Sequence, residues 1–121
     1  MRTILAAEIR RIANTCLWSL QGWRAAWASE KSLRQWTVVN ILSAILAFSL
    51  HLSPAERALI LALGLMVLAA ELANTAIEEI VDHVSPDLHP FAQKAKDCGS
   101  ACVALTAIAG GLAWLVVLIG A

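Results

Sequence analysis

An acidic stretch follows directly on the most apolar part of this chain and limits what the chain can fold into. The run that starts near Ala58 reads as membrane interior, yet it continues into ELANTAIEEIVD at residues 71–82. On a helix the polar residues of this stretch share one face about 16 Å long: Glu71, Asn74, Glu78 and Asp82. A carboxylate at bilayer depth is costly unless it is paired, hydrated or metal-bound, so this face is a candidate functional site. A stripe that only holds helices together is the alternative.

Composition places the chain in a membrane. Of its 121 residues, 60% are hydrophobic and 15% charged, whereas soluble domains contain about 45–50% apolar residues. The length predicts one domain over residues 1–121. The formal net charge is zero, which provides no basic field for nucleic acid, so we expect no such partner. The three cysteines have no metal-ligand spacing to any histidine and read as small apolar residues.

Hydrophobic periodicity predicts an all-α membrane protein. Its first helix is amphipathic and rich in Trp and Arg, which suits the membrane interface. A short charged elbow at residues 30–35 follows, and Ser53 with Pro54 forms a helix start after the first span. The first span is near the short limit for crossing hydrocarbon. We expect the surface helix at residues 5–29 and three transmembrane helices at residues 36–52, 58–82 and 98–119.

The basic residues predict the orientation of these spans. Six of the nine Lys and Arg residues precede Trp36, and eight of nine lie in the amino-terminal segment or the second loop. By the positive-inside rule, the amino terminus and the second loop are cytoplasmic and the carboxyl terminus is outside. Glu30, the acidic end of the second span, and Lys96 with Asp97 then meet at the cytoplasmic surface.

Acids beside lysines at a membrane surface suit a divalent cation and a polyphosphate. Mg²⁺ prefers carboxylate and phosphate oxygens and keeps several waters. The chain has no G-x-x-x-x-G-K-[ST] motif and no Gly-rich loop after a strand, which excludes the soluble kinase folds. Glu71 lies deeper, where it could accept a proton from a lipid hydroxyl. Composition and spacing therefore indicate a small membrane enzyme or an ion-handling protein.

Two motifs resemble a known family. ELANTAIEEIVD and the later HPFAQKAKDCGSACV are similar to the signature of the prokaryotic integral-membrane diacylglycerol kinases. The segment GWRAAWASEKSLRQ resembles the same family, and the likeness covers about residues 11–114. It implies a three-span homotrimer with an amphipathic first helix. It also implies transfer of the γ-phosphoryl of MgATP to a lipid hydroxyl at the cytoplasmic face of a bacterial inner membrane, giving phosphatidic acid.

The resemblance assigns residues to the nucleotide and its metal. Glu71 resembles the general base and Asn74 its neighbour, and Glu30 with Glu78 resembles the carboxylates that hold Mg²⁺ on ATP. The residues that match nucleotide contacts, besides these two carboxylates, are Arg11, Trp18, Asp87, His89, Lys96 and Asp97.

The resemblance also implies a lipid site that includes Glu71. Its other members lie near the first elbow and on the third span: Arg24, Ala25, Ala26, Trp27, Ser32, Arg34, Gln35, Ser100 and Trp114. Because one copy has only three spans and too few walls for both substrates, we expect sites shared between subunits of the trimer.

Two departures and two alternatives remain. Trp18 stands where the family pattern has Tyr, and Glu79 adds an acid that points away from Glu78 by about 100°. Related enzymes phosphorylate undecaprenol with nearly the same motifs, although the A-A-W and L-R-Q elements favour diacylglycerol. A small ion-handling or scaffold protein would need only the acidic stripe, and it would not explain why Glu30 and Lys96 reach the same surface.

Overall fold

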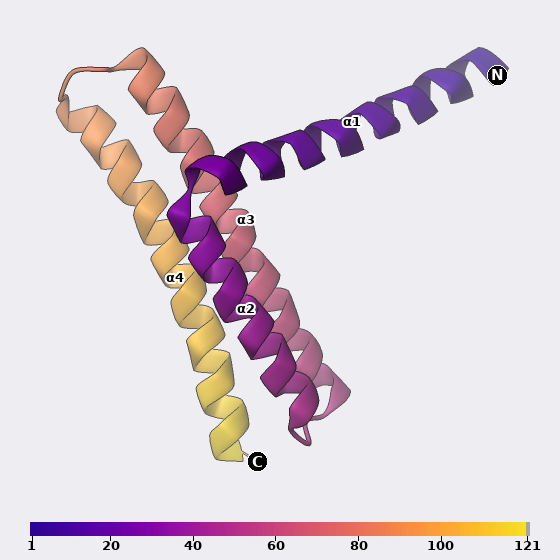
Figure 1. Cartoon of the computed structure of the whole chain (residues 1–121), viewed down its shortest axis with the longest axis vertical. Helices are drawn as coiled ribbons and strands as arrows, with labels where there is room; N and C mark the ends of the chain where they lie inside the picture. Colours follow the sequence, from indigo (N-terminus) through magenta and orange to yellow (C-terminus); the bar gives the residue numbers. More distant parts are fainter. Residues whose placement is uncertain (121) are drawn as a thin grey trace. The chain divides into compact units, whose positions relative to one another are not determined.

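The computed structural model describes residues 1–120 and is all-helical over that range (Figure 1). Its helices are α1 (Arg2–Ser29), α2 (Lys31–Ser49), α3 (Pro54–Val84) and α4 (Pro90–Gly120). The chain divides into two units, one ending at Glu30 and one starting at Lys31. We describe each unit by itself, and the expected all-α class is confirmed.

The first unit consists of α1 and its cap. Apolar side chains recur along it and are exposed, among them Leu5, Ile9 and Ile12. Arg11 pairs with Glu8 one turn earlier, with 2.8 Å between Nη2 and Oε2. The helix ends at Glu30, whose extended backbone caps it while its N–H donates to Ala26.

The expected elbow at residues 30–35 is wrong in its length. Only Glu30 departs from helical geometry, and α2 begins at Lys31. Residues 31–35 contain no Gly or Pro and consist mostly of residues that favour helix, so nothing in them prevents the helix from starting early.

The turn between α2 and α3 is held by a capping box. The Ser53 hydroxyl accepts from the Glu56 N–H, and the Ser53 N–H donates to Glu56 Oε1 at 2.9 Å. Hydrogen bonding to the Glu56 carboxylate, first from the Ser53 backbone N–H and then from the Ser53 side chain, lowers the pKa of Glu56 below its ordinary value. Ser53 as N-cap and Pro54 at the first helical position are confirmed, so α3 starts before Ala58. Arg57 closes the turn by donating to the Ala47 carbonyl at 2.9 Å.

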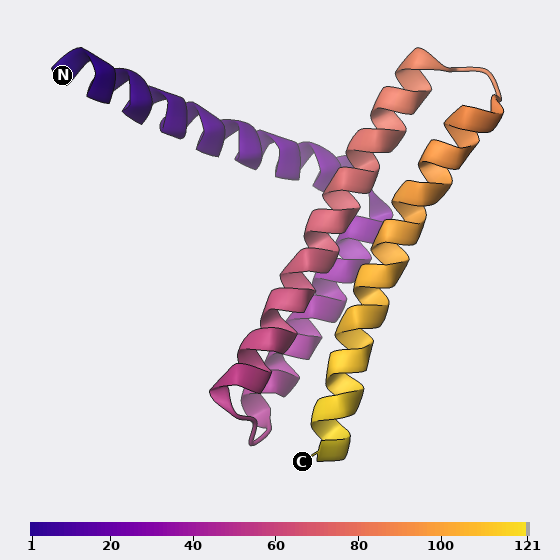
Figure 2. The ribbon, with the colours of Figure 1, turned by 180° about the vertical axis from the view of Figure 1, so that it is seen from behind.

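The second unit is organised around α3, which packs against both α2 and α4 (Figures 1 and 2). Two glycines allow close approach. Gly64 of α3 lies against Asn40 of α2, and Gly99 of α4 lies against Asn74 of α3. Between α2 and α4, the Trp114 indole N–H donates to the Ser43 hydroxyl at 2.8 Å.

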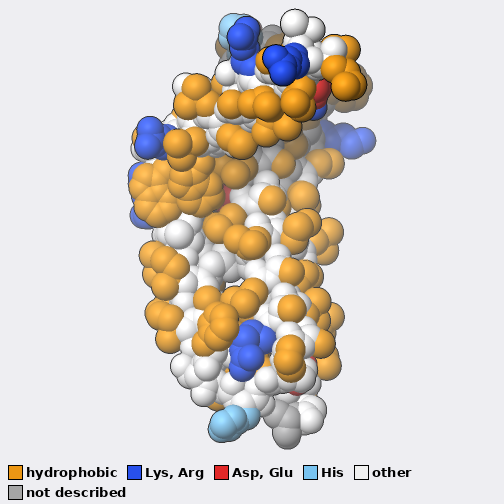
Figure 3. Space-filling view, turned by 90° about the vertical axis from the view of Figure 1, so that its right-hand side faces the viewer, with side chains coloured by type: hydrophobic (Ala, Val, Ile, Leu, Met, Phe, Trp, Pro, Cys, Tyr) orange, Lys and Arg blue, Asp and Glu red, His pale blue; other side chains and the backbone are white. Residues whose placement is uncertain are grey.

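Two helices, α3 and α4, are long and apolar enough to cross a membrane. Only 17% of the most apolar stretch of each is buried inside the protein, unlike the core helix of a soluble domain. Large hydrophobic side chains such as Leu65 and Leu105 face outward. Figure 3 shows hydrophobic side chains over much of the visible surface, as expected for a surface in contact with lipid.

Candidate functional site

Glu71 is a buried carboxylate near the middle of α3. Its residue surface is only 5% exposed. The Ser32 hydroxyl, in the first turn of α2, donates to Glu71 Oε2 at 3.0 Å. A buried carboxylate is tolerated only when it is hydrogen-bonded or paired, and Ser32 supplies such a bond from another helix. The bond joins residues 39 positions apart and fixes the carboxylate at the junction of α2 and α3.

One turn further along α3, Asn74 links to Glu78. Asn74 Nδ2 donates to Glu78 Oε1 at 3.2 Å. The Asn74 Oδ1 atom is buried and has no hydrogen-bond partner among residues 1–120. Glu78 is half-buried, whereas its neighbour Glu79 is exposed, as the 100° offset predicted. The Asn74 amide therefore holds Glu78, the acid of the two that faces the interior of the bundle.

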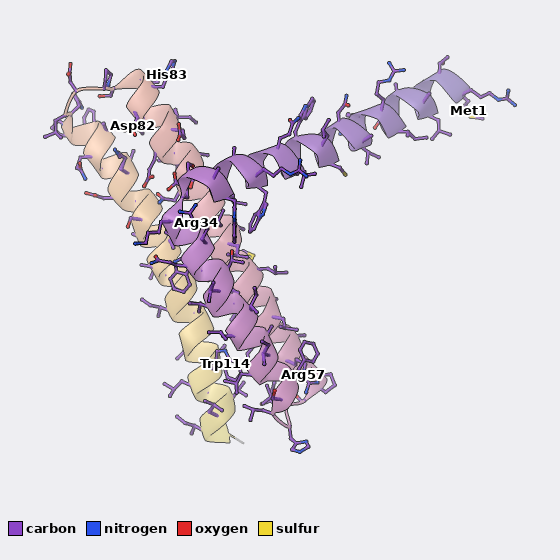
Figure 4. The ribbon with its side chains drawn as sticks, in the orientation of Figure 1. Met1, Arg34, Arg57, Asp82, His83 and Trp114 are labelled. Atoms are coloured by element: carbon purple, nitrogen blue, oxygen red, sulfur yellow. The ribbon has the colours of Figure 1, made fainter. Side chains whose placement is uncertain are left out.

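The end of this face is joined to α4 by an ion pair. Lys96 Nζ lies 2.9 Å from Asp82 Oδ1. This hydrogen bond and the charge of Asp82 raise the pKa of Lys96, which lies before the apolar part of α4. Beside it, Gln93 Nε2 donates to Asp97 Oδ1 at 2.8 Å. Figure 4 shows Asp82 and His83 towards the end of the bundle where α3 and α4 are connected.

The α3–α4 connection adds a small polar pocket of about 80 Å³. His89 Nδ1 accepts from the Phe91 N–H at 3.1 Å, and its ring lies against the Phe91 ring. The pocket brings together Asp82, Asp87, His89 and Lys96. Three residues expected to contact nucleotide, Asp87, His89 and Lys96, therefore lie around one pocket. Asp82 lies with them, although the sequence indicated only its place on the polar face of the helix.

The remaining expected site residues are distributed over both units. Arg34 is half-buried, and Gln35 and Ser100 are exposed, in the bundle. The first unit holds the others: Arg11, Trp18, Arg24, Ala25, Ala26, Trp27 and Glu30. Within that unit Trp23 stacks on Trp27 with ring centroids 5.9 Å apart. The Ser29 hydroxyl donates to Glu30 Oε1 at 3.3 Å.

Trp114 lies closer to the opposite end of the bundle, near the level of Arg57 in Figure 4. It lines a cavity of about 230 Å³ between α2, α3 and α4. Along α3 this cavity extends from Ile60 to Val67, which is one helical turn from Glu71. Trp114 is thus not part of the polar face, but it borders an apolar space that begins next to it.

No group of three His, Cys, Asp or Glu side chains in the described part of the chain is arranged to hold a metal ion. The polar face nonetheless offers hard oxygens, those of the Glu78 carboxylate. Mg²⁺ is commonly bound by one or two carboxylates together with substrate phosphates and water. The oxygen chemistry of this face fits Mg²⁺ brought in with a phosphate ligand.

Comparison with known proteins identifies the family to which the chain belongs. The sequence model of the prokaryotic diacylglycerol kinase family matches residues 17–118. The chain belongs to this family. It is 43% identical over 114 residues to a diacylglycerol kinase of Pseudomonas aeruginosa, covering 93% of this chain and 91% of that protein. Identity is 33% over 108 residues to the Escherichia coli K12 diacylglycerol kinase, covering 89% and 88%. It is 31% over 106 residues to that of Haemophilus influenzae, covering 88% and 90%.

Three contacts between helices of this diacylglycerol kinase family member were not predicted from the sequence. Ser32 was expected near lipid but not as a hydrogen-bond donor to Glu71, Asp82 was not paired with Lys96, and Gly99 was not placed beside Asn74. For Gly99 a signal existed, because a glycine directly follows the A-K-D-C run. The other two pairs join separate helices and have no spacing that a sequence reveals.

The Lys96–Asp82 pair generates a test with a matched control. Lys96→Ala removes a cation from the polar pocket, and we expect the KM for ATP to rise about tenfold or more, as for loss of a charge-assisted hydrogen bond. Lys94→Ala removes the same charge from an exposed position two residues away and should change KM little. Steady-state kinetics of both variants decide the matter. Equal losses would contradict a specific role for Lys96.

Proposed function

We propose that this protein is a diacylglycerol kinase that transfers the γ-phosphoryl group of ATP to the free hydroxyl of diacylglycerol, giving phosphatidic acid and ADP. The observation that carries the proposal is Glu71, a buried carboxylate held by Ser32 inside an apolar helix bundle of this family. A carboxylate in such a place is kept for function, because packing alone favours an apolar side chain.

Glu71 is proposed as the general base. The lipid hydroxyl loses its proton to the Glu71 carboxylate as its oxygen attacks the γ-phosphorus. A new P–O bond forms while the bond from that phosphorus to the β–γ bridging oxygen breaks, and ADP leaves. Catalysis of this kind depends mainly on positioning and on charge neutralisation, with the base orienting the nucleophile. Ser32 keeps one carboxylate oxygen in place, which leaves the other available to the hydroxyl.

The apolar cavity next to this carboxylate supports a lipid substrate. It begins one turn from Glu71, at Val67, and continues between the helices to Trp114. An acyl chain there would leave the glycerol hydroxyl at the level of the polar face. The residues of the α2 start, Arg34 and Gln35, and Ser100 on α4 are proposed to line the headgroup side. From the first unit, residues 24–27 are proposed to join them.

The nucleotide and its metal are proposed to lie towards the α3–α4 connection. Mg²⁺ bound with ATP neutralises charge on the phosphates. Glu78, oriented by Asn74, and Glu30 are proposed as the carboxylates that hold it. Lys96, Asp97, Asp87 and His89 are proposed to contact the nucleotide from the bundle, and Arg11 and Trp18 from α1. The tryptophan has no phenolic hydroxyl, so no hydroxyl contact is proposed at position 18.

Diacylglycerol is favoured over undecaprenol by the names of the relatives and by the A-A-W and L-R-Q elements. The test is an assay of purified protein in detergent with labelled ATP. Phosphatidic acid should form from diacylglycerol much faster than phosphate is transferred to undecaprenol. Chelation of Mg²⁺ should abolish transfer and added Mg²⁺ should restore it. Faster transfer to undecaprenol would overturn the substrate assignment, and no transfer to either lipid would favour an ion-handling or scaffold role.

The proposed base gives a sharper prediction. Glu71→Gln keeps the shape of the side chain but cannot take the proton, so kcat should fall about 10²–10⁴-fold. Nucleotide binding and folding should remain. Glu79→Gln, an exposed acid on the same helix, is the control and should change kcat little. If Glu71→Gln kept more than about a tenth of the wild-type kcat, this residue would not be the base.

The proposed topology has three spans, with α2 as the first. The 19 residues of α2 extend about 28 Å, close to the roughly 30 Å of hydrocarbon. The bias of Lys and Arg supports a cytoplasmic amino terminus. A reporter fused after residue 121, which lies outside the described residues, should be active only outside the cytoplasm. Activity inside would put the polar face on the side without ATP.

A homotrimer with shared sites is proposed because the three spans of one copy provide too few walls to enclose both lipid and nucleotide. Mixing Glu71→Gln chains with Glu30→Gln chains tests this arrangement. If one site draws these residues from different subunits, mixed trimers contain some intact sites and activity should recover. Absence of recovery at every ratio would indicate sites formed within single chains.

A further inference from the structure

Gly99 of α4 lies directly against the side-chain amide of Asn74. A methyl group on Gly99 would overlap Asn74 Oδ1 and would come within 3.3 Å of Asn74 Cγ. The same methyl would lie 3.5 Å from Ile77 Cδ1. Gly99 is buried, so a methyl group added there could not avoid the overlap by turning into solvent. The two helices approach this closely because residue 99 has no side chain.

The contact fixes which way the Asn74 amide points. A carboxylate only accepts hydrogen bonds, so the amide must turn its NH₂ group towards Glu78, as the 3.2 Å bond shows. Its oxygen then faces Gly99, where it is buried and has no hydrogen-bond partner in residues 1–120. The glycine thus accommodates the oxygen by leaving space for it.

We propose that Gly99 is a positioning residue for nucleotide use, which acts through Asn74 on the carboxylate of Glu78. The inference rests on the proposed function, in which Glu78 holds the metal on ATP. An alanine at position 99 would displace the amide, because the end of a side chain moves more easily than two packed helices. Displacement breaks the bond from Asn74 to Glu78 and leaves that carboxylate without its orienting partner.

The chain contains a matched contact away from the polar face. A methyl on Gly64 would lie 2.5 Å from Asn40 Oδ1 and 3.3 Å from Asn40 Cγ. Asn40 thus lies against a glycine in the same way, at the α2–α3 contact, where both residues line the apolar cavity. Gly64→Ala therefore creates the same kind of steric overlap as Gly99→Ala without affecting Glu78. A purely structural role predicts similar behaviour of the two variants, whereas positioning predicts different kinetics.

The experiment measures KM for MgATP, KM for diacylglycerol and the melting temperature of the detergent-solubilised protein. Gly99→Ala should raise KM for MgATP about 10–100-fold, as for other residues that orient a metal ligand, and should leave KM for diacylglycerol unchanged. Gly64→Ala narrows the cavity proposed for the lipid, so it should lower the melting temperature and raise KM for diacylglycerol, while KM for MgATP stays unchanged. Asn74→Ala removes the amide oxygen that Gly99 accommodates. In that background Gly99→Ala should raise KM for MgATP and lower the melting temperature little further.

The outcomes separate this inference from the proposed function. Wild-type protein without lipid phosphorylation would refute the proposed function, and the effects of the two substitutions on melting temperature would still decide the contact. The inference would be overturned if the effects of Gly99→Ala and Asn74→Ala on KM for MgATP were additive. Equal changes in KM for MgATP in Gly99→Ala and Gly64→Ala would overturn it as well. If Gly99→Ala alone does not fold, folding of the double variant supports the Asn74 route, and failure of the double variant overturns it.

Discussion

The hydrogen bond from Ser32 to Glu71 is the interaction on which the rest of the structure depends. A carboxylate inside an apolar bundle costs free energy that only bonding to it can offset. Ser32 meets this need from the first turn of α2 at 3.0 Å, so the start of α2 must lie against the middle of α3. The position of α2 in the bundle is thus tied to a polar requirement of α3.

The same logic continues along α3 but with α4 as the partner. Asn74 lies against Gly99, and Asp82 pairs with Lys96 at 2.9 Å. Three of the four polar side chains on this face of α3 are thus matched by a residue of a neighbouring helix, and Glu78 accepts a hydrogen bond from Asn74 on α3 itself. Apolar side chains point outward elsewhere on the bundle, where lipid is their natural surrounding. One helix therefore carries both the membrane-facing surface and the polar face, and its 31 residues are long enough for both.

Much of this could be predicted from the sequence because it depends on local periodicity. The shared face of Glu71 and Glu78, the outward position of Glu79 and the cap at Ser53 follow from spacing along one helix. The start of α2 at Lys31 did not, because charged residues were read as an elbow although they favour helix. The partner Ser32 could not be predicted, and the sequence marks Gly99 only as a small residue after the A-K-D-C run, because both contacts depend on how separate helices approach one another. Their contacts with Glu71 and Asn74 arise only in the packed bundle.

The central claim is that Glu71 acts as the base while Ser32 holds it in position, and a double-mutant cycle on kcat tests this most directly. Ser32→Ala, which removes one hydrogen bond to a charged group, should lower kcat about tenfold or more. Combined with Glu71→Gln, it should lower kcat no further than Glu71→Gln alone, because the serine then has no base to position. A double variant whose loss equals the product of the two single losses would contradict this account.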